Sequence, residues 1–535
     1  MYVRTVSRKN KDGSRVYYFQ IVEKYWDSET KQAKTKVVCS LGRADKNGEK
    51  RLRQLASSIR KRLSLDEMAE LDGWKFEDSW EHGAFHAVSE LWEKLGLRKI
   101  LEKSVKQEDR SVPFEMAIFA MVANRCLAPS SKLCCYESWL AEDVYFPEGR
   151  KLKLHHLYRA MDLLDRNKEA IEEAVYWYIG DLLNLDVDLI FYDTTSIYFE
   201  IDEEDDLKRR GHSKDGRVDR PQIVVGLAVT RDGIPVKFWV FPGNAADVAT
   251  IEKVKEDIRG WKLNRCIFVT DTGMSSEQNL HSLSRGGGHY ISAMSCIKGS
   301  EVVEEVLSRK GRYSPVADNL EVKEVWVGEG VRRRRYVICR NPLEMKRQSE
   351  YRKEILEQLT AELETLAGHP KRACRLMASR RYGKYLRKLK SGELRINRAA
   401  VKAHSRRDGL WVIRSNDETL SAEDLALAYK QLMRVEDAWR TMKSGLDLRP
   451  VFHRSPERIR AHVYLCTLGL LIERVAEKAA GGTWRTIRNT LRRQKIGQLF
   501  TPNGRVFQTS NPDAEARNLY KKLKIPPPKQ IMAVE

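Results

Sequence analysis

Two aspartates stand directly behind apolar runs that are typical of buried strands. Asp193 follows residues 189–192 (LIFY), and Asp271 follows residues 266–270 (CIFVT). A carboxylate at the end of a buried strand is costly to desolvate unless a cation compensates its charge. Both positions therefore predict a cation site. Taken singly, such an aspartate more often caps a helix or forms a turn, and that alternative stays open for each.

A third acid, Glu436, lies in a segment with helical spacing of apolar residues. The segment opens with Ser421, which has Asp424 three residues later, a capping signature. Seven residues separate Tyr429 from Glu436 and Glu436 from Lys443, so the three share one helix face beside the apolar stripe. The alternative for Glu436 is a surface acid that pairs with Arg440, four residues later.

Together the three acids suit phosphodiester chemistry. In-line hydrolysis or transesterification of a phosphodiester uses two divalent ions about 3.5–4 Å apart. Carboxylate oxygens suit Mg²⁺, for which Mn²⁺ can substitute, and no His or Cys cluster nearby favours zinc. We expect Asp193, Asp271 and Glu436 to hold two such ions, and Lys443 to bind a phosphate as a point charge.

The order of expected elements around these acids predicts the fold class, α/β. Three strands are followed by a helix, a strand, a short helix and a strand: 188–197, 222–230, 234–241, 247–261, 266–270, a short helix, and 289–294. Three meandering strands and then right-handed crossovers are what a ribonuclease H-like mixed sheet requires. In that sheet the first and fourth strands are adjacent and parallel, which would make Asp193 and Asp271 neighbours.

The rest of the chain predicts further modules around this catalytic core. We expect the catalytic domain at 185–295 and 416–480, interrupted by a β-rich and helical insertion at 296–415. The other expected parts are a small β-rich module at 1–50, a helical module at 51–184 that we expect to bind DNA, and a basic, partly unstructured C-terminal tail at 481–535. A packing or dimerisation role is the alternative for the helical module.

The charge of the chain favours a nucleic-acid partner. Lys and Arg number 96 against 75 Asp and Glu, a net charge of +21, and neutralising phosphates releases condensed counterions. No segment has the roughly 20 apolar residues that span a bilayer, and the first residues lack the apolar run of a signal peptide. We therefore expect a protein that binds a polyanion, has no membrane partner and works in the cytoplasm; a merely basic soluble protein is the alternative.

Several basic residues are candidates for DNA contact. Between Arg380 and Arg407 eleven Lys or Arg stand against one acid, Glu393. A solvated charged face is the alternative for this segment. Ser455 and Pro456 open a helix whose N-terminus could receive a phosphate. The candidates are Tyr429, Arg440, Lys443, Arg454, Arg458, Arg380, Arg381, Lys384, Arg387 and Lys388.

Four separated stretches resemble the DDE transposases of bacterial insertion sequences, in the cut-and-paste branch with a β-rich insertion before the catalytic Glu. They are FYDTTSIYFE around Asp193, GHSKDGRVDRPQIVVGLAV with GIPVKFWVFPGNAAD, FVTDTGMSS around Asp271, and YKQLMRVEDAWRTMKSGLDLRPVFHRSPERIRAHVYL around Glu436. That branch carries Tyr, two residues, Arg, three residues, Glu, six residues, Lys. Here the Arg position holds Leu432, and Arg440 is the better candidate for the lost phosphate contact.

This resemblance, which covers about residues 185–480, implies an activity on double-stranded DNA in a bacterial or archaeal cell, and an assembly. Water attacks a strand at the end of the element, the freed 3′ hydroxyl attacks target DNA, and a homodimer holds the paired ends in a synaptic complex. Two alternatives remain: a ribonuclease H-like structure-selective nuclease that never joins, and a non-catalytic DNA-binding protein derived from a transposase. The three intact acids argue against the second.

Overall fold

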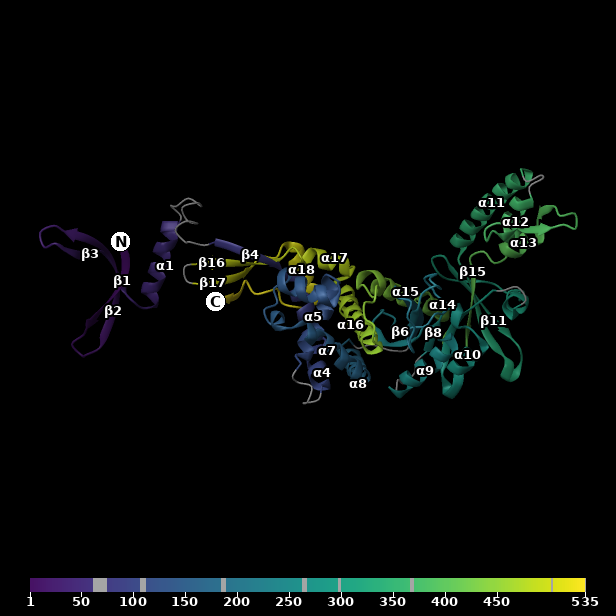
Figure 1. Ribbon diagram of the computed structural model, residues 1–535, viewed down its shortest axis with the longest axis horizontal. Helices are drawn as coiled ribbons and strands as arrows, with labels where there is room; N and C mark the ends of the chain where they lie inside the picture. Colours follow the sequence, from purple (N-terminus) through teal and green to yellow (C-terminus); the bar gives the residue numbers. More distant parts are fainter. Residues whose placement is uncertain are drawn as a thin grey trace. The chain divides into compact units, whose positions relative to one another are not determined.

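The structure is a computed structural model that describes residues 1–60, 75–105, 112–183, 189–261, 267–296, 300–365, 370–501 and 504–534 (Figure 1). It divides into two compact units. One comprises Met1–Ser79, Ile496–Asn511 and Lys529–Glu535, and the other comprises Trp80–Lys495 and Pro512–Pro528. The three acids all lie in the second unit.

The first unit begins with the predicted β meander. Strands β1 (Tyr2–Lys9), β2 (Arg15–Asp27) and β3 (Gln32–Arg43) form an antiparallel sheet, followed by α1 (Lys46–Arg60). At the first turn Gly13 has a φ of +87°, and the Ser14 amide and hydroxyl donate to Asp12 Oδ1 at 3.0 and 2.7 Å. The Asp-Gly pair therefore forms the turn that its chemistry predicts.

The C-terminal region is more regular than expected. The prediction of a partly unstructured tail is wrong for most of it, because the region contains helices and strands. They are α17 (Trp484–Leu491), β16 (Lys495–Thr501), β17 (Gly504–Thr509), α18 (Ala514–Leu523) and β18 (Ile531–Val534). The strands form a four-stranded sheet in the order β18-β17-β16-β4, in which β4 is Lys75–Glu81. Their partner comes from near the start of the chain, a pairing that local sequence does not reveal.

The second unit opens with the predicted helices, which share a core with a helix from much later in the chain. Its N-terminal helices are α3 (Gly83–Lys94), α4 (Leu97–Ser104), α5 (Phe114–Leu127), α6 (Lys132–Cys134), α7 (Leu154–Arg166) and α8 (Lys168–Leu183). Helix α5 is buried almost all round, and α16 (Pro456–Ala480) packs against both α5 and α7. Ser455 caps α16 and Pro456 is its first residue, as predicted. Across the described residues, no helix combines the length and apolar character needed to cross a membrane.

A nine-stranded mixed sheet forms the centre of the second unit. Its strands include β5 (Leu189–Tyr198), β6 (Gln222–Val229), β7 (Pro235–Pro242), β8 (Ile267–Thr270) and β9 (His289–Met294), with α9 (Asp247–Gly260) and α10 (Glu277–Ser284) as crossovers. These strands stand in the order β7-β6-β5-β8-β9. Strand β8 is parallel to both β5 and β9, whereas β6 is antiparallel to β5 and β7. The predicted adjacency of the first and fourth strands is confirmed.

The segment expected as an insertion divides into two parts. Its strands continue the central sheet beyond β9 in the order β15 (Leu410–Ser415), β12 (Arg334–Arg340), β11 (Leu320–Val327) and β10 (Ser314–Ala317). They cover the edge that β9 would otherwise expose. The remainder has an apolar cluster of its own, built from α11 (Pro342–Glu364), α12 (Pro370–Ala378), β13 (Leu386–Lys388), β14 (Leu394–Ile396) and α13 (Arg398–Ser405).

The helix expected to run on from Ser421 is broken. Ser421 caps it as predicted, accepting from the Asp424 amide at 3.0 Å. Helix α14 (Ala422–Lys430) then stops, α15 (Met433–Arg440) begins, and a π-helical turn, Thr441–Gly445, ends it. Helix α14 packs on β11, β12, β15 and β9, whereas α15 packs on β5 and β6. Because a sheet twists, one straight helix does not follow both regions, and the chain tightens into i→i+3 bonds at 431–432.

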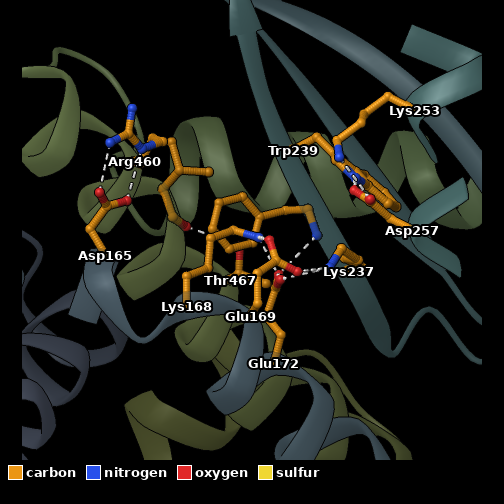
Figure 2. A network of polar contacts seen from close by, with 12 residues as sticks. Asp165, Lys168, Glu169, Glu172, Lys237, Trp239, Lys253, Asp257, Arg460 and Thr467 are labelled. Carbon is orange, nitrogen blue, oxygen red and sulfur yellow. Dashed lines mark hydrogen bonds and ion pairs between the residues drawn. The ribbon is translucent and has the colours of Figure 1, made fainter. Parts of the chain in front are cut away.

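A buried ionic network joins helix α8 to strand β7. Figure 2 shows the Lys237 ammonium from β7 beside the carboxylates of Glu169 and Glu172 from α8. Only 1% of the Lys237 side chain and 4% of the Glu172 side chain are exposed, and the Phe238 amide donates to Glu172 Oε1 at 3.2 Å. Lys168 pairs with both acids as well, so the buried Lys237 is the member that would lose its counter-charges if the two acids were removed. The network thus fixes the helices before residue 184 against the sheet that carries the acids.

Candidate functional site

Asp193 lies in the middle of β5, where the strand crosses the candidate site. Its neighbours in the strand are buried, and 22% of its own side chain is exposed. Burial raises the pKa of the Asp193 carboxyl, while the Lys214 ammonium opposes that rise. The negative charge of Asp271 raises the pKa further. Asp193 is therefore a partly desolvated acid with another acid in electrostatic range.

Asp271 follows β8 directly and is exposed. The parallel register pairs Phe191 with Val269, and each aspartate stands two residues beyond its member of this pair. The parallel strands thus bring both carboxylates to the same level of the sheet. The Asp271 carbonyl accepts from the Met274 amide at 3.0 Å, which closes a turn immediately after the strand.

Glu436 reaches the same place from α15, which packs on β5 and β6. Burial raises the pKa of the Glu436 carboxyl, and the charges of Asp193 and Asp271 raise it further. Arg440 opposes this rise, but its ion pair is with Asp437, at 3.0 Å. The three predicted acids therefore converge on one electrostatic cluster despite the helix break.

Tyr429 also reaches this cluster. Its hydroxyl donates to Asp271 Oδ1 at 3.1 Å. Burial, followed by the charge of Asp271, raises the pKa of the tyrosine well above its ordinary value. Tyr429 therefore stays protonated and serves Asp271 as a hydrogen-bond donor, a more specific role than the DNA contact expected from the sequence.

Four residues near the acids form a second charged group that the sequence did not single out as a unit. Lys214 Nζ lies 3.3 Å from Asp193 Oδ1. Asp215 pairs with Lys443 at 3.3 Å and with Arg449 at 2.7 Å. Of these, only Lys443 was predicted. Lys214, Asp215 and Gly216 have the chemistry of a surface turn, so their types alone carried no signal for a site.

The donor chemistry of the three acids fits a hard divalent cation. They offer only carboxylate oxygens, and two of them have raised pKa values because ionised carboxylates here are desolvated or repelled. A cation relieves both costs. Within the described ranges, however, no three His, Cys, Asp or Glu side chains are close enough to make a ready metal site. The three carboxylates lie within electrostatic range of one another, but their oxygen atoms do not surround one common point.

The remaining predicted DNA contacts separate into exposed and engaged side chains. Arg454 and Arg440 are exposed, although Arg440 pairs with Asp437. Arg458 makes a two-pronged ion pair with Asp162 of α7, at 2.8 and 3.0 Å, and stacks over Tyr158. Arg458 thus packs α16 against α7, and the structure does not leave it free at the helix N-terminus.

The basic residues predicted in the insertion lie on its small helical part and are exposed. Arg381 donates to Gln358 and lies over the Tyr382 ring, and Lys384 lies over Tyr385. Arg387 and Lys388 are on strand β13. The exposed members of this surface are Arg380, Arg381, Lys384, Arg387 and Lys388.

Comparisons with known proteins cover the N-terminal region and the part of the sequence that carries the three acids. Residues 188–472 match the family described as Transposase DDE domain, and residues 3–69 match the IS1634 family transposase, N-terminal domain. No curated protein matches. A solved structure, the piggyBac transposase synaptic complex with hairpin DNA, is 9% identical, with 78% of this chain and 82% of that chain covered and a TM-score of 0.32. A score of that size does not establish a common fold. Because the first family match spans more than half of the sequence, the chain belongs to the DDE transposases of bacterial insertion sequences.

Proposed function

We propose that this transposase cuts DNA at the ends of its insertion sequence and joins the freed 3′ hydroxyl to target DNA, with Asp193, Asp271 and Glu436 as its catalytic acids. One observation carries the assignment of residues: acids from β5, from the end of β8 and from α15 enter one electrostatic cluster. All three lie within the matched DDE region. Unrelated surface acids would have no reason to meet at the same level of a sheet.

We propose a ribonuclease H-like fold for the catalytic core. Support comes from the strand order β7-β6-β5-β8-β9, with three antiparallel strands and then two parallel crossovers. In this arrangement the first acid stands on the first strand and the second follows the fourth strand. The third acid comes from the helix after the insertion, where Glu436 stands.

The DDE transposases use divalent metal ions, and we propose two Mg²⁺ ions, replaceable by Mn²⁺, held by Asp193, Asp271 and Glu436. Bound there, the ions would activate the attacking oxygen and stabilise the leaving oxygen of a phosphodiester. The acids would have to turn toward each other to share them. Tyr429 keeps Asp271 oriented through its hydrogen bond. Lys443 and Arg449 supply positive charge beside the acids for a DNA phosphate, with Asp215 fixing their positions.

The DNA partner follows from the family, and its mode of binding is part of the proposal. The exposed basic surface of the insertion and Arg454 are proposed to bind phosphates. A homodimer is proposed for the synaptic complex, in which two ends are processed together. The alternative, a nuclease of the same fold that hydrolyses without joining, predicts the same acids and differs in the product.

The experiment is a strand-transfer assay with Mg²⁺ on linear DNA that carries the sequences flanking the gene. Joined products support the proposal, nicks without joining favour the nuclease, and bound but uncut DNA favours a non-catalytic binder. Asp193→Asn, Asp271→Asn and Glu436→Gln should each bind this DNA as the wild type does and lose cleavage. If any one variant retains cleavage, the acid that it replaces is not catalytic.

A further inference from the structure

Lys214 makes contacts that place its ammonium group against a proposed metal ligand. Its Nζ lies 3.3 Å from Asp193 Oδ1 and also donates to the carbonyl and the hydroxyl of Thr194. Of the two side chains, 22% of Asp193 and 44% of Lys214 are exposed. The ammonium is thus held by three oxygens of neighbouring residues on β5, and one of them belongs to the proposed metal ligand Asp193.

The position of Lys214 is set by its loop as well as by the ion pair. The Lys214 amide donates to Ser196 Oγ, also on β5, at 2.7 Å. A turn follows at once, in which the Gly216 amide donates to the Ser213 carbonyl at 3.2 Å and Gly216 has a φ of +74°. The backbone at Lys214 is therefore fixed to the strand that carries Asp193, and the side chain has only a short distance to cover.

The next residue explains why Lys214 turns to Asp193. Asp215, the nearest acid in sequence, already pairs with Lys443 and Arg449. Burial lowers the pKa of the Lys443 ammonium, and the charges of Arg449 and Lys214 lower it further, so both cations lie within electrostatic range of Lys443. Asp215 thus already pairs with two cations, and the carboxylate that pairs with Lys214 is that of Asp193.

We propose that Lys214 is a resident counter-ion that competes with the divalent metal ion for Asp193 and so weakens metal binding. This inference rests on the proposed metal role of Asp193. The ammonium takes one acceptor direction of Asp193 Oδ1 and places a positive charge beside the carboxylate, so a metal ion bound to Asp193 would be repelled by Lys214. The long lysine stem lets the ammonium move away from the ion, because it carries a mobile point charge. Lys214 is thus a positioning residue that sets the affinity of the site for metal.

The test is a titration of the full-length protein with Mn²⁺, in which electron paramagnetic resonance measures the free ion. Lys214→Gln should lower the dissociation constant for Mn²⁺ by about fivefold, the scale of a partly exposed ion pair. Lys214→Arg restores a charge that can contact Asp193 and should return the constant toward the wild-type value. The matched control is Arg209→Gln, which removes one charge from the same loop but from a pair with Asp206.

A second readout separates competition from a loss of packing. Adding Mn²⁺ should raise the melting temperature of Lys214→Gln more than that of the wild type, because tighter binding stabilises the folded state more. An Mn²⁺ affinity equal to that of Arg209→Gln, or weaker than that of the wild type, overturns the inference. Asp193→Asn distinguishes the two proposals: if it leaves Mn²⁺ binding unchanged, the metal role of Asp193 fails. If it abolishes binding while Lys214→Gln changes nothing, only the role of Lys214 fails.

Discussion

The Tyr429 hydroxyl donates a hydrogen bond to Asp271 Oδ1 at 3.1 Å, across 158 positions of the chain. Tyr429 closes α14, and Asp271 follows the buried strand β8. This bond connects the helix after the insertion with the sheet before it. It also uses one of the four lone-pair directions of the carboxylate and leaves the others for a cation.

Tyr429→Phe should slow DNA cleavage by about tenfold without unfolding the protein. The hydrogen bond is to a charged group, and such bonds contribute roughly 1.5–3 kcal/mol when buried and less at this partly exposed site. Without it Asp271 is free to rotate. The measurement is the single-turnover rate of end cleavage, with thermal unfolding as the control for folding. A cleavage rate equal to that of the wild type would mean that the bond does not orient Asp271 during the reaction.

Glu436→Gln should raise the thermal stability of the metal-free protein at pH 7. The folded state raises the pKa of Glu436 through burial and through the charges of Asp193 and Asp271. Ionising this acid therefore costs more in the folded than in the unfolded state, and the full cost is present above the raised pKa. As pH falls through that pKa toward the unfolded value, about 4.3, protonation removes the cost.

Melting temperatures of the wild type and Glu436→Gln, measured from pH 7 downward, check this sign. The two curves should approach each other as pH falls, with the variant higher at neutral pH. A variant less stable than the wild type at pH 7 would show that Glu436 makes favourable contacts that outweigh the repulsion.

How far the sequence could predict this site depends on whether the signal was local. Apolar runs stand directly before Asp193 and Asp271, and the handedness of crossovers then fixes the adjacency of their strands. The N-cap at Ser421 was also predictable, because its signal lies in residues next to it in the sequence. The helix break at 431–432 was not, because neither Pro nor Gly marks it and the cause is the twist of a sheet whose extent was unknown.

The partners of charged side chains were the least predictable feature. Arg458 has the type and position of a phosphate ligand at a helix N-terminus, yet its partner Asp162 lies 296 positions earlier. Lys214 and Asp215 stand in a turn sequence, and only the folded chain brings them to Asp193 and Lys443. Residue type predicted which charges exist, and tertiary packing determined which of them remain available to DNA.

Arg458→Gln and Arg454→Gln should therefore behave differently. Arg458 is bound to Asp162 with 37% of its side chain exposed, so its loss should lower the free energy of unfolding by roughly 0.5–1 kcal/mol, the range for a partly exposed pair. DNA affinity should change little. Arg454 is exposed at the start of the same helix, and its loss should weaken DNA binding without changing stability. Urea unfolding and fluorescence anisotropy with labelled DNA measure the two effects. If Arg458→Gln weakens DNA binding and leaves stability unchanged, Arg458 contacts DNA after all.

The pH dependence of stability should also report on Glu473, a buried acid of α16. Burial raises its pKa to about 8, and Glu477 adds to the rise. The unfolded chain ionises this group near pH 4.3, so the unfolded state holds fewer protons between that value and pH 8 and stability falls as pH rises through this window. Glu473→Gln should flatten this part of the curve between pH 5 and 8. Glu457→Gln, which removes an exposed acid from the same helix, is the control. An unchanged slope in Glu473→Gln would show that this acid does not couple folding to pH.

The basic surface of the insertion should contribute to DNA binding through charge alone. Arg387 is exposed on strand β13, whereas Arg395, on the paired strand β14, is held by Glu393 at 2.9 Å. If Arg387 contacts one phosphate, Arg387→Gln should reduce the slope of log affinity against log salt concentration by about 0.9, similarly for any DNA sequence. Arg395→Gln removes the same charge from the same hairpin, but its ion pair already occupies it, so the slope should change less. A slope in Arg387→Gln equal to that of the wild type would mean that this surface is merely solvated, and the transposase would then have to engage its DNA through other basic residues.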